Sequence, residues 1–500
     1  MRPRNLAFSV TVTVLLALAV SPLIAAQEGR AMHHRYKLID MGTFGGPTSV
    51  IYALTGPLNN RGVAASCADT SNLDSNYPNI NPFFGSDPYV QHAFRWKGRL
   101  QDLGTLPGGT SSCSQWVNDR GLIVGASTNG QIDPLLGVPE IRAALWKDGS
   151  VFDLGTLGGN ESVAYSLNKR AEIVGGALNT ISDPYTSSFF NFFISGATQV
   201  HSFLVKRDGI MHDLGTLGTG TDSMAFYVND GGQVAGQSFT DTTVNASTRL
   251  PTMHPFLWEN GKMKDLGTIG GTLVQQIAGL NAKGLVAGAM NVAGDNSYHP
   301  FLWDGRSLVD LGTFGGNYGV AFGMNDTGEV VGWAGIPGDQ IPHAFLWREG
   351  VLTDLNFLEG DDKSLAEVVN ASGQIVGWSA YSQGNTHVFL WENNGPMVNL
   401  QNLVISGPNL TLMPDLFIND QGEITSNALT PDGNNHAVVL IPCDENHLSI
   451  EGCDYALVDG SAAADAGGRV QSGSTTKTGT PTSAFHVWLR GRRPSRSPRP

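Results

Sequence analysis

Short apolar runs, each broken by Gly, Asp or Asn, recur along this chain. Segments such as residues 299–303 hold four or five apolar and aromatic residues, and none continues with the 3.6-residue period of a helix. The apolar runs on either side of Asp148-Gly149 predict a β-hairpin, because Asp-Gly favours a tight turn between strands. Residues 162–168 and 172–177 predict a second hairpin. Each unit of about 45 residues therefore predicts four short strands.

Three motifs order these strands, and they recur eight times in the same sequence. The first is DLGTLGG, clearest at residues 153–159. The second is an Asn followed by a Gly and a small apolar run that ends in Gly, as at 325–332. The third is HAFLW, clearest at 343–347. Successive copies lie 44 to 62 residues apart, which predicts a repeat architecture with one shared core.

The spacing within the units shows where the chain tolerates insertion. The distance from the motif Asn to the closing Gly is always seven residues, with Ser66 and Ser426 in place of this Gly in the terminal units, whereas the stretch from there to the third motif varies. This stretch runs 26, 17, 26 and 18 residues in the first four units and 10 or 11 in the last four. Because loops absorb insertions and strands do not, we expect these connections on one surface of the assembly.

The two ends of the repeat region complement each other. Residues 36–40 form the second half of a hairpin, with no HAFLW before them, and residues 436–440 form the first half, with no DLG after them. Pairing the two would complete an eighth unit and remove the free edges. We therefore predict an all-β fold, a closed propeller of about eight four-stranded blades over residues 36–442, whose N-terminal strand closes the last blade. Seven blades with a divergent terminal unit are the alternative.

Composition and charge narrow the classes of partner. The chain has 500 residues, 41% of them apolar, and most of its 63 Gly lie in the motifs at expected turns. The net charge of −14 argues against nucleic acid or an anionic membrane as partner of the body.

The two termini differ from the repeats. Residues 1–26 have a basic start at Arg2 and Arg4, an apolar stretch and small residues at Ala25 and Ala26, which predicts a secretory signal peptide, with a membrane anchor as the alternative. We therefore expect a secreted protein, extracellular or periplasmic, with no transmembrane span. Residues 443–459 form a Cys-containing cap segment. Residues 460–500 predict a disordered basic tail.

The four cysteines fit an exported protein. Cys443 and Cys453 are close in sequence, which favours a disulfide between them, and Cys67 and Cys113 would link neighbouring units. Free buried thiols are the alternative for each pair.

The repeated His and Asp residues predict a structural network. A His and an Asp about eleven residues apart face each other across a hairpin, and a set repeated in most units is a poor candidate for a single active site. Clear copies of this pair are His254 with Asp265, His299 with Asp310, and His343 with Asp354. A ring of His that binds metal is the alternative.

No catalytic residue, metal site or cofactor is predicted from the motifs. DLGTLGG lacks the Lys-Ser/Thr and the helix of a phosphate loop. Calcium is a weak candidate only. Asp69, Asn72, Asp74 and Asn76 alternate oxygen ligands but lack the Gly and Glu of a calcium loop, so a solvated loop is the preferred interpretation.

HAFLW and DLGTLGG in register resemble the HAF-repeat family of probable extracellular repeat proteins. The resemblance covers residues 36–442 and departs from the pattern at Arg142, Ala143, Ser202, Val205 and residues 356–359. It implies export and a repeat body, and no established reaction.

Aromatic residues cluster in the long connections of the first and third units. Such clusters suggest a contact surface, although they can also pack on one another to order the loops. The candidate ligand-binding residues are Tyr77, Phe83, Phe84, Tyr89, Tyr185, Phe189 and Phe190. We predict a non-enzymatic scaffold that binds an extracellular protein or polysaccharide through the loops of the first four units. An extracellular propeller enzyme that cleaves carbohydrate or peptide is the alternative.

Overall fold

The computed structural model describes residues 32–459, apart from 53–54, 86, 135, 186–197, 339–340, 383, 385, 393 and 449. The expected signal peptide and basic tail lie outside these residues. The described chain folds into β-strands and two short 3-10 helices, η1 (Pro82–Phe84) and η2 (Leu400–Leu403). None of its helices has the length and apolar character needed to cross a bilayer.

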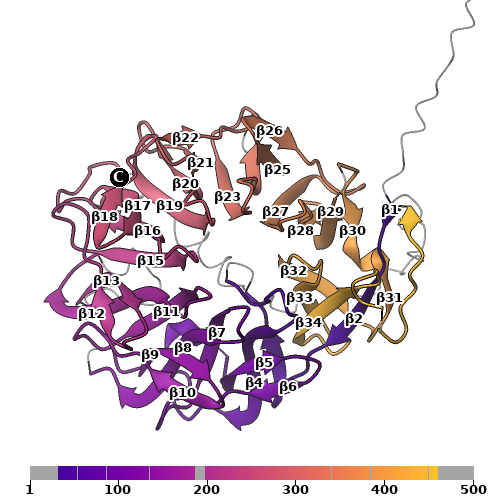
Figure 1. Cartoon of the computed structure of the whole chain (residues 1–500), viewed down its shortest axis with the longest axis horizontal. Helices are drawn as coiled ribbons and strands as arrows, with labels where there is room; N and C mark the ends of the chain where they lie inside the picture. The colour runs from indigo at the N-terminus through magenta and orange to yellow at the C-terminus, as the bar shows by residue number, and fades with distance from the viewer. Residues whose placement is uncertain are drawn as a thin grey trace, which may run out of the picture. The chain divides into compact units, whose positions relative to one another are not determined.

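Eight antiparallel sheets stand around a common axis, which confirms the predicted eight-bladed propeller (Figure 1). In blades 1 to 7 the chain runs from the innermost strand outwards. Blade 1 consists of β3 (Gly45–Val50), β4 (Ala64–Leu73), β5 (Tyr89–Trp96) and β6 (Leu100–Asp102), and blade 2 of β7 (Ser112–Val117), β8 (Ile123–Ile132), β9 (Pro139–Lys147) and β10 (Ser150–Asp153). Blade 3 consists of β11 (Ser162–Leu167), β12 (Ile173–Ser182), β13 (Thr198–Val205) and β14 (Met211–Asp213), and blade 4 of β15 (Ser223–Val228), β16 (Val234–Phe239), β17 (Met253–Glu259) and β18 (Lys262–Asp265).

Blades 5 to 7 repeat the same order. Blade 5 consists of β19 (Gly270–Leu280), β20 (Val286–Val292), β21 (Tyr298–Trp303) and β22 (Leu308–Asp310). Blade 6 consists of β23 (Gly319–Met324), β24 (Val330–Gly335), β25 (Pro342–Arg348) and β26 (Val351–Asp354). Blade 7 consists of β27 (Lys363–Val369), β28 (Ile375–Ala380), β29 (Thr386–Trp391) and β30 (Val398–Asn399).

Blade 8 is built from both ends of the repeat region, as the sequence predicted. Its inner three strands are β32 (Thr411–Ile418), β33 (Ile424–Leu429) and β34 (Asn435–Pro442), and the N-terminal β2 (Tyr36–Asp40) pairs antiparallel with β34. A short strand, β31 (Val404–Ser406), adds outside β2, so this sheet has five strands. Beyond the ring, β1 (Met32–His33) pairs with β35 (Val458–Asp459).

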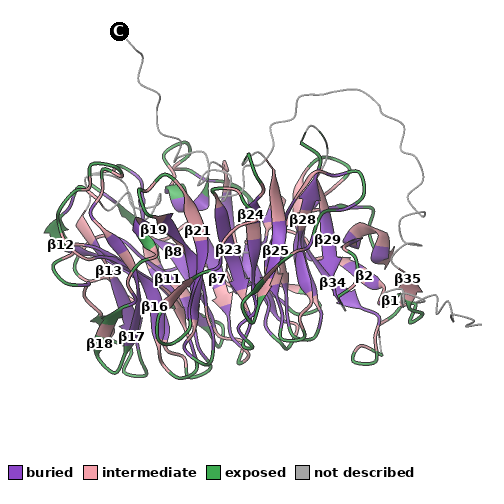
Figure 2. Ribbon diagram, turned by 90° about the horizontal axis from the view of Figure 1, so that it is seen from above, coloured by how far each residue is buried: buried purple, intermediate pink, exposed green. Residues whose placement is uncertain are grey.

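The up-and-down path of each blade defines two faces of the ring. The Asn-containing turns between the first and second strands lie on one face, which we call the turn face. The connections between the second and third strands lie on the opposite face, which we call the long-loop face. The long connections span residues 74–88, 133–138, 183–197 and 240–252 in blades 1 to 4. Figure 2 shows the exposed tip of β12 at the edge of the ring.

Core packing explains why the second motif ends in Gly and the third contains Phe. The closing Gly of the second motif lies opposite the Phe of HAFLW, as Gly332 does opposite Phe345. A Cβ on Gly332 would lie 1.9 Å from the carbonyl oxygen of Val320, so no side chain fits there. The Phe is fully buried in six blades, at positions 94, 203, 256, 301, 345 and 389. These rings fill the space between blades and supply much of the apolar burial that stabilises the ring.

The first motif and the tight turns use glycine in two ways. Asp148 and Gly149 both have positive φ, 52° and 76°, as the predicted two-residue hairpin turn requires. In DLGTLGG, Gly158 has φ of 107°, whereas a Cβ on Gly159 would lie 2.6 Å from the Asn179 oxygen. The glycine doublet therefore serves both a left-handed turn and close packing.

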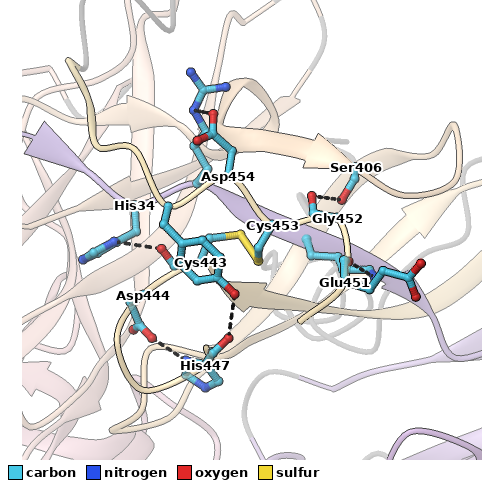
Figure 3. The surroundings of a disulfide bond; sticks show 12 residues. His34, Ser406, Cys443, Asp444, His447, Glu451, Gly452, Cys453 and Asp454 are labelled. Carbon is cyan, nitrogen blue, oxygen red and sulfur yellow. Dashed lines mark hydrogen bonds and ion pairs between the residues drawn. A yellow bond between two sulfur atoms is a disulfide. The ribbon is translucent and has the colours of Figure 1, made fainter. Parts of the chain in front are cut away.

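Both predicted disulfides are present. Cys67 of β4 is bonded to Cys113 of β7, which joins blades 1 and 2. Cys443 is bonded to Cys453 and holds the chain that follows blade 8 in a closed loop (Figure 3). No cysteine of the chain is left free.

Candidate functional site

The repeated His and Asp residues form pairs in six of the eight blades. The His Nδ1 lies 2.8 to 2.9 Å from an Asp carboxylate oxygen in six places, namely His92–Asp102, His201–Asp213, His254–Asp265, His299–Asp310, His343–Asp354 and His436–Asp40. The last pair joins β34 to the N-terminal β2 across the ring closure.

Each pair also orders the turn that follows it. The Asp265 Oδ1 accepts a hydrogen bond from the Gly267 N–H at 2.7 Å, so one carboxylate fixes both the histidine and the start of the connection to the next blade. In the two blades that lack one residue of the His–Asp pair, the remaining side chains form other pairs. Arg142 pairs with Glu140 in blade 2, and His387 pairs with Asp361 because Asn399 occupies the Asp position. Within the described residues, no three His, Cys, Asp or Glu side chains converge as metal ligands.

The motif Asn residues form a closed ring of hydrogen bonds on the turn face. Each Asn donates from Nδ2 to the backbone oxygen of the equivalent Asn in the next blade, at 2.7 to 3.4 Å. The order is Asn59, Asn118, Asn168, Asn229, Asn281, Asn325, Asn370 and Asn419, and the last donates to Asn59. The Oδ1 of each caps its own turn, as Asn325 does for the N–H of Thr327 and Glu329. This residue therefore builds the fold and is not a ligand site.

Aromatic side chains bridge the inner strands that border the central channel. Tyr165 and Phe226 of adjacent blades have ring centroids 5.5 Å apart. Trp116 and Tyr227 are in contact at 6.0 Å although blade 3 lies between their blades. Rings that reach each other past an intervening blade occupy the channel itself, so this part of the channel is filled by side chains.

An acidic pair lies at the seam of blades 7 and 8. The Glu367 carboxylate accepts hydrogen bonds from the backbone N–H of Asp415 and of Leu416, at 3.3 and 2.5 Å. Burial raises the pKa of both Glu367 and Asp415, and for Glu367 the charge of Asp415 adds to it. Burial, followed by the charge of Asp415, raises the pKa of Tyr52 to about 12.

Sequence reasoning missed this pair. Glu367 and Asp415 come from different units and outside the motifs, and two carboxylates that meet only in space leave no local pattern. A pair of this kind outside the repeated positions is the feature that would favour an enzyme.

The long-loop face of the first four blades presents exposed apolar side chains. Leu73 is 67% exposed and Ile181 is 57% exposed, each close to the end of a second strand that extends beyond the ring. The full set comprises Leu73, Tyr77, Ile132, Ile181 and Val244, at least one from each of the four blades. In blades 5 to 8, the described connections between second and third strands present one such side chain, Tyr381, and the connection between β26 and β27 presents Phe357.

The aromatic residues named from the sequence divide between surface and interior. Tyr77 is exposed, and Tyr89 is half-buried. Tyr185 is also half-buried and packs edge-on against Phe239, with ring centroids 6.0 Å apart. Phe189 and Phe190 lie outside the described residues.

Phe83 and Phe84 require a correction. They are only 8% and 6% exposed and pack on each other in a T-shaped contact, so they order the first loop and do not form a ligand-contact surface. Sequence alone could not separate these cases, because it does not show which aromatic residues of a long loop pack on one another, as Phe83 and Phe84 do, and which stay exposed, as Tyr77 does.

The first long loop crosses over blade 2 to reach blade 3. The Asn81 Nδ2 donates to Glu161 Oε1 at 2.7 Å and to the Pro139 oxygen at 3.0 Å. Glu161 is fully buried, and this burial, followed by the charges of Asp133 and Glu140, raises its pKa to about 8. This contact makes the loops of blades 1 to 3 one connected layer.

Asp69 is one of the residues considered above as a weak calcium candidate. Its carboxylate accepts two hydrogen bonds from Thr48.

No protein-family model matches the chain, and no curated protein sequence matches it. Among solved structures, the β-propeller domain of the Trilobed protease from Pyrococcus furiosus is similar over 74% of this chain and 97% of its own length, with 11% identity and a TM-score of 0.39. A puromycin hydrolase variant is similar over 76% of this chain and 58% of its own, with 14% identity and a TM-score of 0.40. TolB from Acinetobacter baumannii is similar over 61% and 76%, with 11% identity and a TM-score of 0.28. Likenesses this distant carry no argument about function.

Proposed function

We propose that the chain is an exported, non-enzymatic scaffold that binds an extracellular polypeptide through its long-loop face. The observation that carries this proposal is the set of exposed apolar side chains on the first four blades. The repeated residues are engaged in building the ring, so recognition falls to the loops, where the units differ.

The chemistry of the face favours a polypeptide over a polysaccharide. Four of the five exposed apolar residues of the first four blades are aliphatic, whereas sugar rings stack on aromatic faces, and Tyr77 is the one aromatic residue among the five. The acidic residues of these connections are mostly buried, as Asp74, Asp133 and Asp183 are, so the apolar side chains are what this face offers a partner.

Export rests on the N-terminal segment and is supported by the two disulfides, which persist in oxidising compartments. We also propose that the chain is a member of the HAF-repeat family, which it resembles in sequence.

A capture experiment with matched variants tests this function. The immobilised chain is exposed to an extracellular protein extract and, separately, to a polysaccharide mixture. The variant Leu73→Ser/Ile132→Ser/Ile181→Ser removes the apolar side chains of three loops, and Ile210→Ser/Val351→Ser removes two that are 58% and 62% exposed elsewhere on the ring. We expect saturable retention of protein that the loop variant loses and the control keeps. Equal retention by both variants would reject the long-loop face, and retention of polysaccharide alone would reject a polypeptide partner.

The carboxylates of Glu367 and Asp415 favour a second candidate, an extracellular hydrolase. One protonated and one ionised carboxyl group can serve as general acid and base. Glu367→Gln and Asp415→Asn would then abolish product release from peptide or glycan substrates while retention of those substrates persists. Absence of product release from the wild-type chain would remove this candidate.

A further inference from the structure

A pocket of about 470 Å³ lies on the turn face, where the two ends of the repeat region meet. Its walls come from the N-terminal segment, the Asn turns of blades 7 and 8, and the chain that follows β34. The lining residues that matter most are His34, Tyr36, Gln374, Glu392, Asp420 and Asp444. This volume suits a small organic molecule.

The charge of the lining is one-sided. Glu392, Asp420 and Asp444 contribute three carboxylates, and neither Lys nor Arg lines the pocket. Among the described residues, no three acidic or histidine side chains converge closely enough to bind a metal ion. Separated carboxylates around an open volume suit an extended organic cation better than a metal.

Tyr36 contributes a phenol to the lining of this volume. Its side chain is only 1% exposed, so it is held in place by the surrounding chain. Glu392 and Asp444 line the same pocket as Tyr36. Burial, followed by the charges of these two carboxylates, raises the pKa of Tyr36 well above its usual value. A neutral phenol can accept a hydrogen bond from a cation.

The acidic walls are held in place before any ligand arrives. The Glu392 Oε1 lies 2.8 Å from the His33 Nδ1, and its Oε2 accepts from Gln374 Nε2 at 2.6 Å. Gln374 accepts in turn from Asn370 of the Asn ring. On the other side, Asp444 accepts from the Asn446 N–H at 2.9 Å (Figure 3 shows Asp444 and His34 beside Cys443). Fixed walls lower the entropic cost of binding.

We propose that this pocket binds a small organic cation, through an ammonium or guanidinium group placed between Tyr36, Asp444 and Glu392. The site lies on the face opposite the long loops and is independent of the function proposed above. Because both chain ends contribute to its walls, the ligand also stabilises the closed ring.

Calorimetric titration of the full chain tests the site with defined probes. These are 1,4-diaminobutane, 4-aminobutylguanidine and Nα-acetyl-lysine methylamide, with 1,4-butanediol as the neutral control. We expect Kd values below about 1 mM for the cations, with no heat from the diol, and several-fold weaker binding when NaCl is raised from about 0.05 to 0.5 M. Tighter binding of the lysine derivative would identify a peptide side chain as the source, and tighter binding of the diamine a free amine. The proposal would be overturned if the cations released no measurable heat of binding at concentrations up to about 10 mM, or if the diol released as much heat as they do.

Variants locate the binding within the pocket. Tyr36→Phe removes only the hydroxyl and Asp444→Asn only the charge, and each is expected to raise Kd about tenfold or more. Asp326→Asn is the matched control, because Asp326 accepts from the Ala282 N–H as Asp420 does from the Ala371 N–H, but lies outside the pocket. If Asp326→Asn weakened binding as much as Asp444→Asn, the effect would come from the overall charge of the chain and not from a site in the pocket.

Discussion

At the scale of residues, the repeated side chains are committed to hydrogen bonds that build the ring. Spacing alone predicted the His–Asp pairing, because residues eleven apart across a hairpin must face each other. The Asn ring was not predicted. Its donors and acceptors are the same residue type in successive blades, and the sequence shows the repetition of Asn but not its contact with the next copy. Glu367 and Asp415 were missed for the same reason, since only the fold brings them together.

Replacement of one ring Asn tests its structural role. Asn325→Ala would leave the N–H groups of Thr327 and Glu329 without their partner and would remove one of the two hydrogen bonds that the Asn370 oxygen accepts, at a cost of about 2–4 kcal/mol in the free energy of unfolding. Chemical denaturation measures this, with the exposed Asn72→Ala as the control, expected within about 0.5 kcal/mol of wild type. A loss of stability no larger than that of the control would refute the role.

The buried Glu161 predicts a pH dependence of stability. Its pKa is raised to about 8 by burial, so the folded chain keeps a proton that the unfolded chain releases. The free energy of unfolding should therefore fall as pH rises from the ordinary carboxyl range through about 8.

Glu161→Gln removes this proton while an amide oxygen can still accept from Asn81. We expect the fall between pH 5 and pH 9 to shrink by about 1–3 kcal/mol, measured by denaturation at both values. The exposed Glu359→Gln serves as control. An unchanged pH profile for Glu161→Gln would mean that this carboxyl is ionised in the folded chain.

At the scale of elements, the strands and turns were the most predictable part of the molecule. Alternation of short apolar runs with Asp-Gly turns predicted the hairpins, and Asp148 and Gly149 adopt the expected positive φ. The confinement of insertions to one connection predicted the long-loop face. The internal order of the loops could not be predicted, because burial of Phe83 and Phe84 depends on contacts with other blades, such as that of Asn81 with Glu161.

The two disulfides should stabilise the ring to different extents. Cys67 and Cys113 are 46 residues apart, whereas Cys443 and Cys453 are 10 apart, so the first closes the longer loop in the unfolded chain. Chain entropy predicts about 4 kcal/mol for the first and about 3 kcal/mol for the second. Paired Cys→Ala variants in denaturant measure both. A larger loss on removing the Cys443–Cys453 bond would show that it stabilises the ring closure beyond its loop entropy.

At the scale of the whole molecule, closure of the ring explains the arrangement of the chain ends. The N-terminal β2 completes blade 8, His436 pairs with Asp40 across that seam, and Asn419 returns the ring of hydrogen bonds to Asn59. Complementary half-hairpins made this closure predictable. The pocket beside it was not, because its walls come from six segments that only the closed ring assembles. The ring thus provides a rigid frame with one variable face.

The most direct test of the proposed function is a map of the bound surface. Hydrogen–deuterium exchange of the wild-type chain, alone and saturated with the captured polypeptide, compares the two faces of the ring. We expect protection concentrated in residues 70–88, 128–138 and 178–185, around Leu73, Ile132 and Ile181. Protection centred on the Asn turns or on the outermost strands would contradict the assignment of binding to the long-loop face.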